Sequence, residues 1–380
     1  MEPMDTIFSS KYILPFSIVA VALVVVIGAA FISNQNSEPQ PTPSPNPTLQ
    51  SSIDGSEFEV QKLFDAGGRY GVDTLLWSPD GSMLAYTTGG GGAYGISIYS
   101  LISPDRGAYA PNTYSLFPIW SPDGKMLAYT SPDGGEAIEG MIEDGKPVLK
   151  SGIWIMNADG SGAKRLTAPN TIAGSPAWSP DGKEIIFAMG ASFNNPFDPL
   201  QIWIMDKDGN NQRKLTNDSP NKGAPQFSPD GKIILYLATE SELPHTSSAV
   251  YDLWVMKAGG SGQKQITDLE YPRSIGVYSW SPQRSEVMFE ESGEIWFGKP
   301  ENKEFQKIAE GASPTFSPDG IKIAYLGGGL WIMNSDGSNK MQLVESLERG
   351  PTGPLSWSPD GKRILFINNF TEVWSIDLAQ

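Results

Sequence analysis

Trp178-Ser179-Pro180-Asp181-Gly182 is one copy of a pentapeptide that returns along most of this sequence. In such a turn, Ser can bond to the backbone, Pro presets its own φ, Asp suits the third position, and Gly accepts the positive φ that closes a hairpin. Each copy therefore predicts a corner between two antiparallel strands. The other copies run from Trp77 to Gly81, Trp120 to Gly124, Phe227 to Gly231, Phe316 to Gly320 and Trp357 to Gly361, with a degenerate copy at Trp280-Ser281-Pro282-Gln283-Arg284.

The corners repeat in steps of 36 to 58 residues, and each begins the same series of segments. An apolar run such as Ile233-Ile234-Leu235-Tyr236 follows the corner, then a run such as Ile202-Trp203-Ile204-Met205, then a polar stretch such as Arg213-Lys214-Leu215-Thr216. Repeats of this length with four short strands are typical of propeller blades. The sequence predicts an all-β fold, a seven-bladed propeller over residues 58–380.

The two ends of the repeat region complement each other. The last repeat stops at Gln380 without a fourth strand, whereas residues 58–64 resemble a fourth strand that has no blade before it. We expect this N-terminal strand to pair with the third strand of the last blade. Such pairing would close the ring and remove two open sheet edges.

The first 57 residues differ in composition from the repeats. Tyr12 to Ile32 carries no charge and is long enough to cross a bilayer. We expect a short cytoplasmic tail (1–11), an uncleaved transmembrane signal-anchor helix (12–33) and a disordered proline-rich linker (34–57). A cleaved signal peptide is the alternative, although its apolar core is usually shorter. The propeller would then lie outside the cytoplasm, in the periplasm or extracellular space, on a single-pass membrane protein.

Charge and residue usage limit the chemistry. The formal charge of −16 disfavours nucleic acid as a partner. The sequence has no cysteine and a single histidine, His245, so thiolate sites and histidine-rich metal sites are excluded. The Asp-Gly turns have alternating oxygen ligands in places but lack the Gly and Glu of a calcium loop. We expect no metal and no cofactor.

The linked motifs Trp-Ser-Pro-Asp-Gly-Lys, Ile-Trp-Ile-Met-Asn and Arg-Leu-Thr resemble the WD-repeat-like blades of the TolB-type β-propeller family. The resemblance covers about residues 58–380. It implies the propeller fold and a role in binding proteins of the envelope. TolB has six blades and an α/β domain, whereas this chain has seven repeats and an anchor, so the Tol partners are not implied. Prolyl-oligopeptidase-type peptidases have similar blades, but no Gly-x-Ser-x-Gly elbow is present. Oligogalacturonate lyases hold their metal partly through several histidines, which this chain lacks.

Residues that recur in every blade are assigned to structure, so function is expected where the blades differ. Successive strands alternate in direction, which places the second-to-third loops and the blade-to-blade loops together on one face, here called the loop face. The corners lie on the opposite face, the turn face. Blades two, three and four carry insertions in their second-to-third loops. The candidate binding residues, all expected on the loop face, are Arg69, Tyr70, Tyr114, Glu136, Glu139, Phe193, Phe197, Asp198, Glu242, His245, Tyr271 and Arg273.

Two functions follow from these residues. The first is a non-enzymatic scaffold that binds an envelope protein or polysaccharide through the loop face. The alternative is a glycan-active lyase or hydrolase, with carboxylates such as Glu136, Asp198 or Glu242 acting as acid and base at the channel mouth. No catalytic residue is assigned, and the propeller fold alone does not decide between the two.

Overall fold

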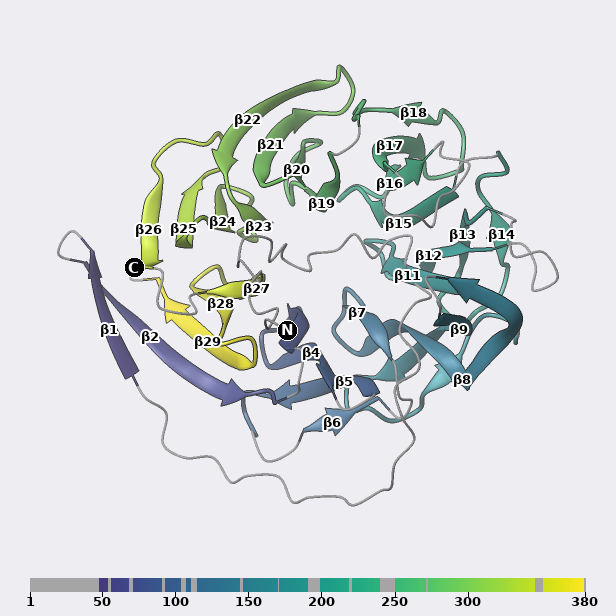
Figure 1. The fold of residues 1–380 in the computed structure, drawn as a ribbon, viewed down its shortest axis with the longest axis horizontal. Coiled ribbons are helices and arrows are strands. Elements are labelled where there is room, and N and C mark those ends of the chain that lie inside the picture. Colours follow the sequence, from purple (N-terminus) through teal and green to yellow (C-terminus); the bar gives the residue numbers. More distant parts are fainter. Residues whose placement is uncertain are drawn as a thin grey trace, which may run out of the picture.

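The computed structural model describes residues 48–53, 56–67, 71–90, 93–103, 107–110, 115–143, 146–169, 171–190, 199–218, 221–239, 250–270, 273–345 and 351–378. Over these residues the chain forms seven antiparallel sheets arranged radially around a central axis (Figure 1). Six sheets have four strands and the seventh has five. The seven-bladed propeller expected from the repeats is therefore confirmed.

Each blade uses one repeat in chain order, from the innermost strand outward. Blade one consists of β3 (Gly71–Trp77), β4 (Met83–Gly90), β5 (Ala93–Ser100) and β6 (Ala108–Tyr109). Blade two consists of β7 (Leu116–Trp120), β8 (Met126–Glu143), β9 (Lys146–Asn157) and β10 (Lys164–Arg165). Blade three consists of β11 (Ala173–Trp178), β12 (Glu184–Met189), β13 (Gln201–Asp206) and β14 (Arg213–Lys214). Blades four and five are β15 (Asn221–Phe227), β16 (Ile233–Thr239), β17 (Asp252–Lys257) and β18 (Lys264–Gln265); and β19 (Ile275–Trp280), β20 (Val287–Glu291), β21 (Glu294–Lys299) and β22 (Glu304–Glu310). Blade six is β23 (Ala312–Phe316), β24 (Lys322–Leu326), β25 (Gly329–Asn334) and β26 (Met341–Glu345), and blade seven is β27 (Thr352–Trp357), β28 (Arg363–Asn368) and β29 (Glu372–Asp377), joined by β2 (Ser56–Asp65) and β1 (Thr48–Ile53).

The corner pentapeptide is built as its residue types predict. Ser179 Oγ donates to Asp181 Oδ1 at 2.7 Å and accepts from the Glu184 backbone N–H at 2.9 Å. Gly182 has φ 69° and donates its N–H to the Ser179 carbonyl. The serine hydroxyl therefore bonds both to the aspartate of the turn and to the N–H of the first residue of the second strand. The degenerate copy still connects β19 to β20, so it forms a genuine fifth blade.

The corners also hold neighbouring blades together. A Cβ added to Gly124 would lie 3.4 Å from Cδ of Pro79, in the corner of the previous blade, and Gly81 has the same relation to Pro359 of the last blade. The corner tryptophans add hydrogen bonds between blades: Trp178 Nε1 donates to the Ile119 carbonyl at 3.2 Å. The pentapeptide thus specifies the contact between blades as well as the turn.

The hydrophobic core lies between adjacent sheets. The second strands are apolar on both faces because they are sandwiched between neighbours, as in β12 and β16, which are almost entirely buried. The last and first blades pack in the same way through Leu365, Ile367 and Val373 against Val72, Leu75 and Leu84. The ring is therefore continuous across the join.

The N-terminal strand lies where the sequence places it. β2 pairs antiparallel with β29, with Val60 opposite Ile376 and Lys62 opposite Trp374 (Figure 1). The sheet also extends further than expected, because β1 pairs with β2 inside the segment 34–57 that was assigned to the linker. The prolines end at Pro47, and Thr48-Leu49-Gln50-Ser51-Ser52-Ile53 has free N–H groups for a ladder. The predicted tail, transmembrane helix and first part of the linker lie outside the described residues.

Candidate functional site

Most of the predicted binding residues lie outside the part of the chain that the structure describes. Arg273 is the one whose side chain is described, and Glu136 and Glu139 are placed as backbone within β8. The others are Arg69, Tyr70, Tyr114, Phe193, Phe197, Asp198, Glu242, His245 and Tyr271. The site is therefore built from the described residues around the loop face.

The insertion of blade two is a strand pair rather than an irregular loop. β8 and β9 continue past the blade as an antiparallel hairpin, with Ser131 opposite Gly152 and Glu143 opposite Lys146. The register shifts twice on the way, between Pro132 and Ala137 and again before Ile142. Two predicted residues, Glu136 and Glu139, thus lie on an extended arm. The sequence signal for it is the run of β-forming residues on both sides of Asp144-Gly145.

The base of this arm is held by a half-buried arginine. Arg165 of β10 donates through Nη2 to the Ser151 carbonyl at 3.4 Å and to Thr171 Oγ1 at 3.1 Å. Its Nε donates to the Thr167 carbonyl at 3.0 Å. Burial lowers the pKa of Arg165 from its usual value, but the guanidinium remains charged at any physiological pH. Arg165 therefore ties the arm to the loop that leads into blade three.

The insertion of blade three also ends at a polar anchor, formed where Leu200 meets Asn221 and Lys222. Asn221 Oδ1 accepts from the Leu200 N–H at 2.6 Å, and Lys222 donates its own N–H to the Leu200 carbonyl. The Lys222 side chain is 1% exposed and its Nζ lies 2.8 Å from Asp218 Oδ1. Burial lowers the pKa of Lys222, and the hydrogen bond that its ammonium donates to Asp218 opposes this change. A buried ammonium is costly unless it is paired, so this ion pair holds the start of β15 against the preceding loop, while the bonds of Asn221 and Lys222 to Leu200 hold it against the end of the insertion.

The insertion of blade four returns to Asp252, the first residue of β17. Its Oδ1 accepts from Thr267 Oγ1 at 2.7 Å and from the Leu269 N–H at 3.0 Å, and its Oδ2 accepts from Gln265 Nε2 at 3.0 Å. Burial raises the pKa of Asp252, while these hydrogen bonds oppose the rise. In each of three adjacent blades, the insertion therefore ends at a buried or half-buried polar side chain that anchors it. None of these anchors was predicted from the sequence, because each depends on contacts between segments of the chain that are brought together by folding.

Blade five carries a compact charged group around Arg273. Arg273 Nη1 lies 2.7 Å from Glu291 Oε1, and this joins a side chain that is 56% exposed to one that is 5% exposed. Further out, Lys307 Nζ pairs with Glu294 at 2.7 Å and with Glu310 at 3.1 Å. Arg273 is thus held by a buried carboxylate instead of projecting freely. Its ion pair with Glu291 had no sequence signal.

Glu290 is a second buried carboxylate in blade five. Its Oε2 accepts from the Ser313 N–H of blade six at 2.9 Å, and Thr130 Oγ1 accepts from the Ser175 N–H at the same place between blades two and three. Burial raises the pKa of Glu290, and the hydrogen bond from Ser313 opposes the rise. Both side chains satisfy an N–H at a bulge where φ is positive. We assign Glu290 to structure for this reason.

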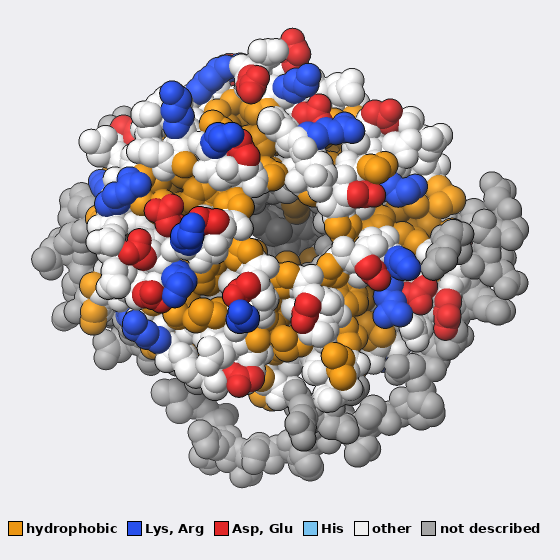
Figure 2. All heavy atoms as spheres, turned by 180° about the vertical axis from the view of Figure 1, so that it is seen from behind, with side chains coloured by type: hydrophobic (Ala, Val, Ile, Leu, Met, Phe, Trp, Pro, Cys, Tyr) orange, Lys and Arg blue, Asp and Glu red, His pale blue; other side chains and the backbone are white. Residues whose placement is uncertain are grey.

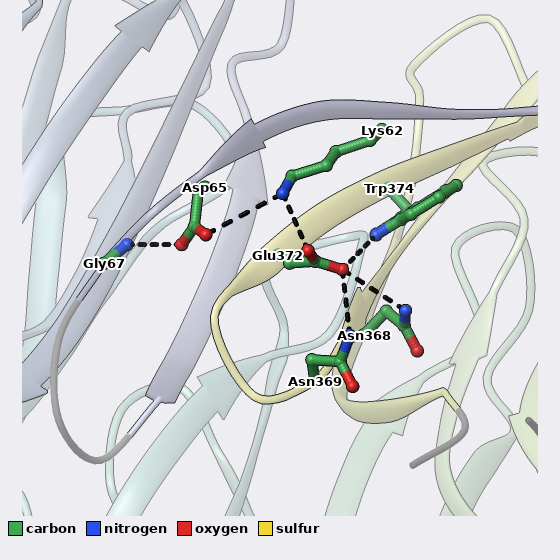
Figure 3. Close-up of polar contacts among 7 residues, drawn as sticks. All are labelled: Lys62, Asp65, Gly67, Asn368, Asn369, Glu372 and Trp374. Atoms are coloured by element: carbon green, nitrogen blue, oxygen red, sulfur yellow. Dashed lines mark hydrogen bonds and ion pairs between the residues drawn. The ribbon is translucent and has the colours of Figure 1, made fainter. Parts of the chain in front are cut away.

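The ring closure forms the densest polar group on the loop face (Figure 3). Glu372, at the start of β29, accepts from Lys62 Nζ of β2 at 2.7 Å through Oε1, and Lys62 also lies 3.7 Å from Asp65. Glu372 Oε2 accepts from Trp374 Nε1 at 3.0 Å, Asn369 Nδ2 at 3.2 Å and Asn368 Nδ2 at 3.3 Å. Burial alone would raise the pKa of Glu372, but these hydrogen bonds and the Lys62 charge lower it overall.

The charges on the surface are mixed in sign. Figure 2 shows acidic and basic side chains interspersed around a central hollow, with apolar atoms between them. Several of these pairs belong to the corners, such as Lys183 with Asp181 at 2.9 Å and Lys232 with Asp230 at 3.0 Å. Across the described ranges, no three His, Asp or Glu side chains lie close enough together to hold a metal ion.

Within the described residues no helix is long and apolar enough to cross a membrane. The segment 12–33 is not among them.

Comparisons with known proteins identify the fold and the family. The structure is similar to an oligogalacturonate lyase in complex with manganese, with TM-score 0.63 and 12% identity over 89% of this chain and 97% of that one. A second oligogalacturonate lyase, from Vibrio parahaemolyticus, gives TM-score 0.61 and 13% identity over 88% and 97%. TolB from Acinetobacter baumannii is 20% identical over 78% of this chain and 68% of that one, with TM-score 0.47.

At these identities the structural similarities describe the fold alone. A search of curated proteins found no match. The family model of the TolB beta propeller domain matches residues 73–295, more than half of the chain. The chain therefore belongs to the TolB β-propeller domain family.

Proposed function

We propose that this protein is a non-enzymatic binding scaffold of the cell envelope, which holds a protein or polysaccharide on the loop face of its propeller. Residues 12–33 would anchor it in the membrane as a single-pass helix, with the propeller outside the cytoplasm. Membership of the TolB β-propeller family supports a binding role, since propellers of this type bind envelope proteins.

One observation carries the proposal. The insertions of three adjacent blades end at the separate polar anchors around Arg165, Lys222 and Asp252. Variable loops on a rigid, closed scaffold are a common arrangement for recognition. By contrast, the repeated Ser, Asp, Gly and Trp of the corners are used in turns and blade contacts. The part of the molecule that is free to vary is therefore the loop face.

The test is capture of envelope components by the full-length protein in its native membrane. A variant with residues 191–198 and 240–249 each replaced by a short Gly-Ser loop should lose cross-linked partners that the wild type retains. Lys183→Ala is the matched control, because Lys183 is 78% exposed and lies on the turn face. Equal capture by the loop variant and the wild type would place binding elsewhere and contradict the proposal.

The second candidate is a glycan-active enzyme, and the similarity in fold to two oligogalacturonate lyases keeps it in view. Its proposed acid and base residues are Glu136, Asp198 and Glu242. The same full-length protein should be incubated with oligogalacturonate and with neutral glycans. Release of shorter products that is lost in Glu136→Gln or Glu242→Gln would favour the enzyme over the scaffold.

A further inference from the structure

Two neighbouring blades join their second and third strands through three-residue turns with very different residues. In blade six, Leu326 pairs with Leu330 across the three-residue loop Gly327-Gly328-Gly329, and in blade seven Asn368 pairs with Glu372 across Asn369-Phe370-Thr371. The middle residues share a left-handed φ, 68° at Gly328 and 67° at Phe370, although the turns differ beside them: Asn369 has φ 50° in blade seven, and Gly329 has φ 150° in blade six. Glycine adopts this conformation without strain, whereas phenylalanine does not.

The turn that carries Phe370 is held firmly by its neighbours. The Phe370 carbonyl accepts from the Val72 N–H at 2.9 Å, and the Thr371 carbonyl accepts from the Ala66 N–H at 2.9 Å. A Cβ on Gly71 would lie only 2.9 Å from the Phe370 carbonyl oxygen, so β3 passes directly against the turn. These contacts involve backbone atoms, which a glycine at position 370 would supply equally well. The aromatic ring is therefore not required for the turn.

The ring of Phe370 is exposed, and no other exposed large hydrophobic side chain of the described residues lies in its turn. It is 52% exposed, and the other large hydrophobic side chains that are exposed in the described residues are Ile102, Tyr109, Ile321 and Met341. Those four follow third strands or lie in corners and outer strands of blades one and six, away from the second-to-third turn of blade seven. A strained conformation that holds an exposed aromatic residue is a known mark of a functional position.

Polar groups flank the ring. Asn369 is exposed and donates its Nδ2 to Glu372. Figure 3 shows its amide oxygen, and that of Asn368, directed away from Glu372. The charges beneath are paired, since Lys62 lies between Glu372 and Asp65. Among the described residues, an exposed phenylalanine ring and the exposed amide of Asn369 therefore lie in one turn, and Lys62, which bonds to Glu372 at the end of this turn, is already paired.

We propose that Phe370 and Asn369 form a binding subsite for a neutral sugar unit. The inference rests on the proposed scaffold function and specifies its ligand as a neutral polysaccharide. The C–H bonds on one face of a pyranose ring carry partial positive charge and stack on the electron-rich face of an aromatic ring. The sugar hydroxyls at its edge donate to and accept from amide side chains such as that of Asn369.

The surroundings favour a neutral sugar over the other ligands considered. An acidic glycan would approach a chain of net charge −16, and Lys62, the cation that bonds to Glu372 at the end of this turn, is already paired. A protein partner normally uses several aromatic or aliphatic anchors in a shared apolar patch. Phe370 has no exposed apolar neighbour of that kind in the described part of the loop face.

The experiment titrates the full-length protein with cellohexaose, mannohexaose, N-acetylchitohexaose and, as the acidic comparison, oligogalacturonate. Binding is followed by saturation-transfer NMR and calorimetry for the wild type and for Phe370→Gly, Phe370→Trp and Asn369→Ala. Phe370→Gly removes the ring and keeps the backbone hydrogen bonds of the turn, and glycine adopts positive φ without strain, so the fold should be retained. Gly328→Phe controls for an aromatic residue placed in the same conformation one blade away.

The proposal predicts that at least one neutral probe binds the wild type, with affinity at least tenfold lower in Phe370→Gly and retained in Phe370→Trp. Asn369→Ala should weaken binding less. The melting temperature of Phe370→Gly should equal or exceed that of the wild type, which separates loss of binding from loss of fold. Binding of oligogalacturonate alone, or of no probe, would overturn the neutral-sugar subsite, as would equal binding by Phe370→Gly.

Failure of this inference can be told from failure of the scaffold function. If the loop variant of blades three and four loses envelope capture while Phe370→Gly retains it, the scaffold function stands and the sugar subsite is wrong. If the wild type captures no envelope component and binds no neutral probe, both are wrong.

Discussion

Positive φ values at described residues other than glycine fall into two groups. Phe117, Ser175, Ala224 and Ser313 recur at the bulge of an innermost strand, each immediately before a proline. At two of them, Ser175 and Ser313, the N–H is satisfied by a side chain of the previous blade, so this strain is part of the blade architecture. The second group lies in turns between strands and consists of Asn211, Ser292, Lys303, Asn339, Asn369 and Phe370. Phe370 is the one large apolar side chain among these six, which is why we interpret it as functional.

The cost of the left-handed conformation can be measured at Gly328. A Cβ at Gly328 meets nothing within 4 Å, and the same holds for Gly95, but only Gly328 has positive φ. We expect Gly328→Ala to destabilise the protein by about 1 kcal/mol, because an L-residue is strained there. Gly95→Ala should be neutral or slightly stabilising. Chemical denaturation of the two variants measures the difference, and equal effects would remove the strain argument.

The carboxylate of Glu372 gives a pH-dependent test at the same scale. Its pKa is lowered in the folded protein from an ordinary value of 4.5. A lowered pKa contributes stability that is fully present above 4.5 and is lost as the pH falls through the lower folded value. The free-energy difference between the wild type and Glu372→Gln should therefore be largest at neutral pH and shrink below pH 4.5. A difference that is constant with pH would show that the Lys62 pair contributes nothing.

At the scale of the element, the corner is the unit that organises the chain. Its serine hydroxyl forms hydrogen bonds within five residues, so the turn depends on local sequence. The degenerate corner in blade five tests how much this matters. Ser281 there has Gln283 in place of the aspartate, and its Oγ has no hydrogen-bond partner in the described structure.

We expect Ser179→Ala to cost about 1 to 2 kcal/mol, because it leaves the Glu184 N–H without its side-chain partner and removes one of the hydrogen bonds to the Asp181 carboxylate. Ser281→Ala should change stability by less than about 0.5 kcal/mol, since no hydrogen bond is lost. Thermal unfolding of both variants provides the comparison. Similar losses at the two positions would mean that the serine acts through packing instead of hydrogen bonding.

The elements differ in how far the sequence could predict them. Corners, second strands and blade number were predictable, since each copy carries its own turn chemistry and apolar run. β1 was missed because the proline-rich composition before Pro47 masked six residues able to form a strand. The anchor Asp252 was missed because its partners, in β18 and the segment after it, meet it only in the folded blade. Lys222 was missed because its burial, which makes its pair with Asp218 matter, has no sequence signal. The partner of Arg273, Glu291, was not identified either.

At the scale of the whole molecule, the propeller is closed by strands from both ends of the chain. β2 supplies the outer strand of blade seven, and its Phe58 and Val60 are buried against residues of blades six and seven. Lys62 adds the ion pair to Glu372. Without β2, the backbone of β29 would become an open sheet edge. Closure is therefore a joint product of packing, ladder hydrogen bonds and one half-buried ion pair.

Deleting residues 56–65 from the full-length protein should strongly destabilise the ring. Burial of Phe58 and Val60 alone contributes about 3 kcal/mol or more, and the exposed edge of β29 should promote aggregation. Deleting residues 48–53 is the matched control, because β1 lies outside β2 and its removal leaves the ring closed. We expect a large fall in melting temperature for the first deletion and a small one for the second. Equal melting temperatures for the two variants would show that blade seven holds without its N-terminal strand, and that packing between the last and first blades is sufficient to close the propeller.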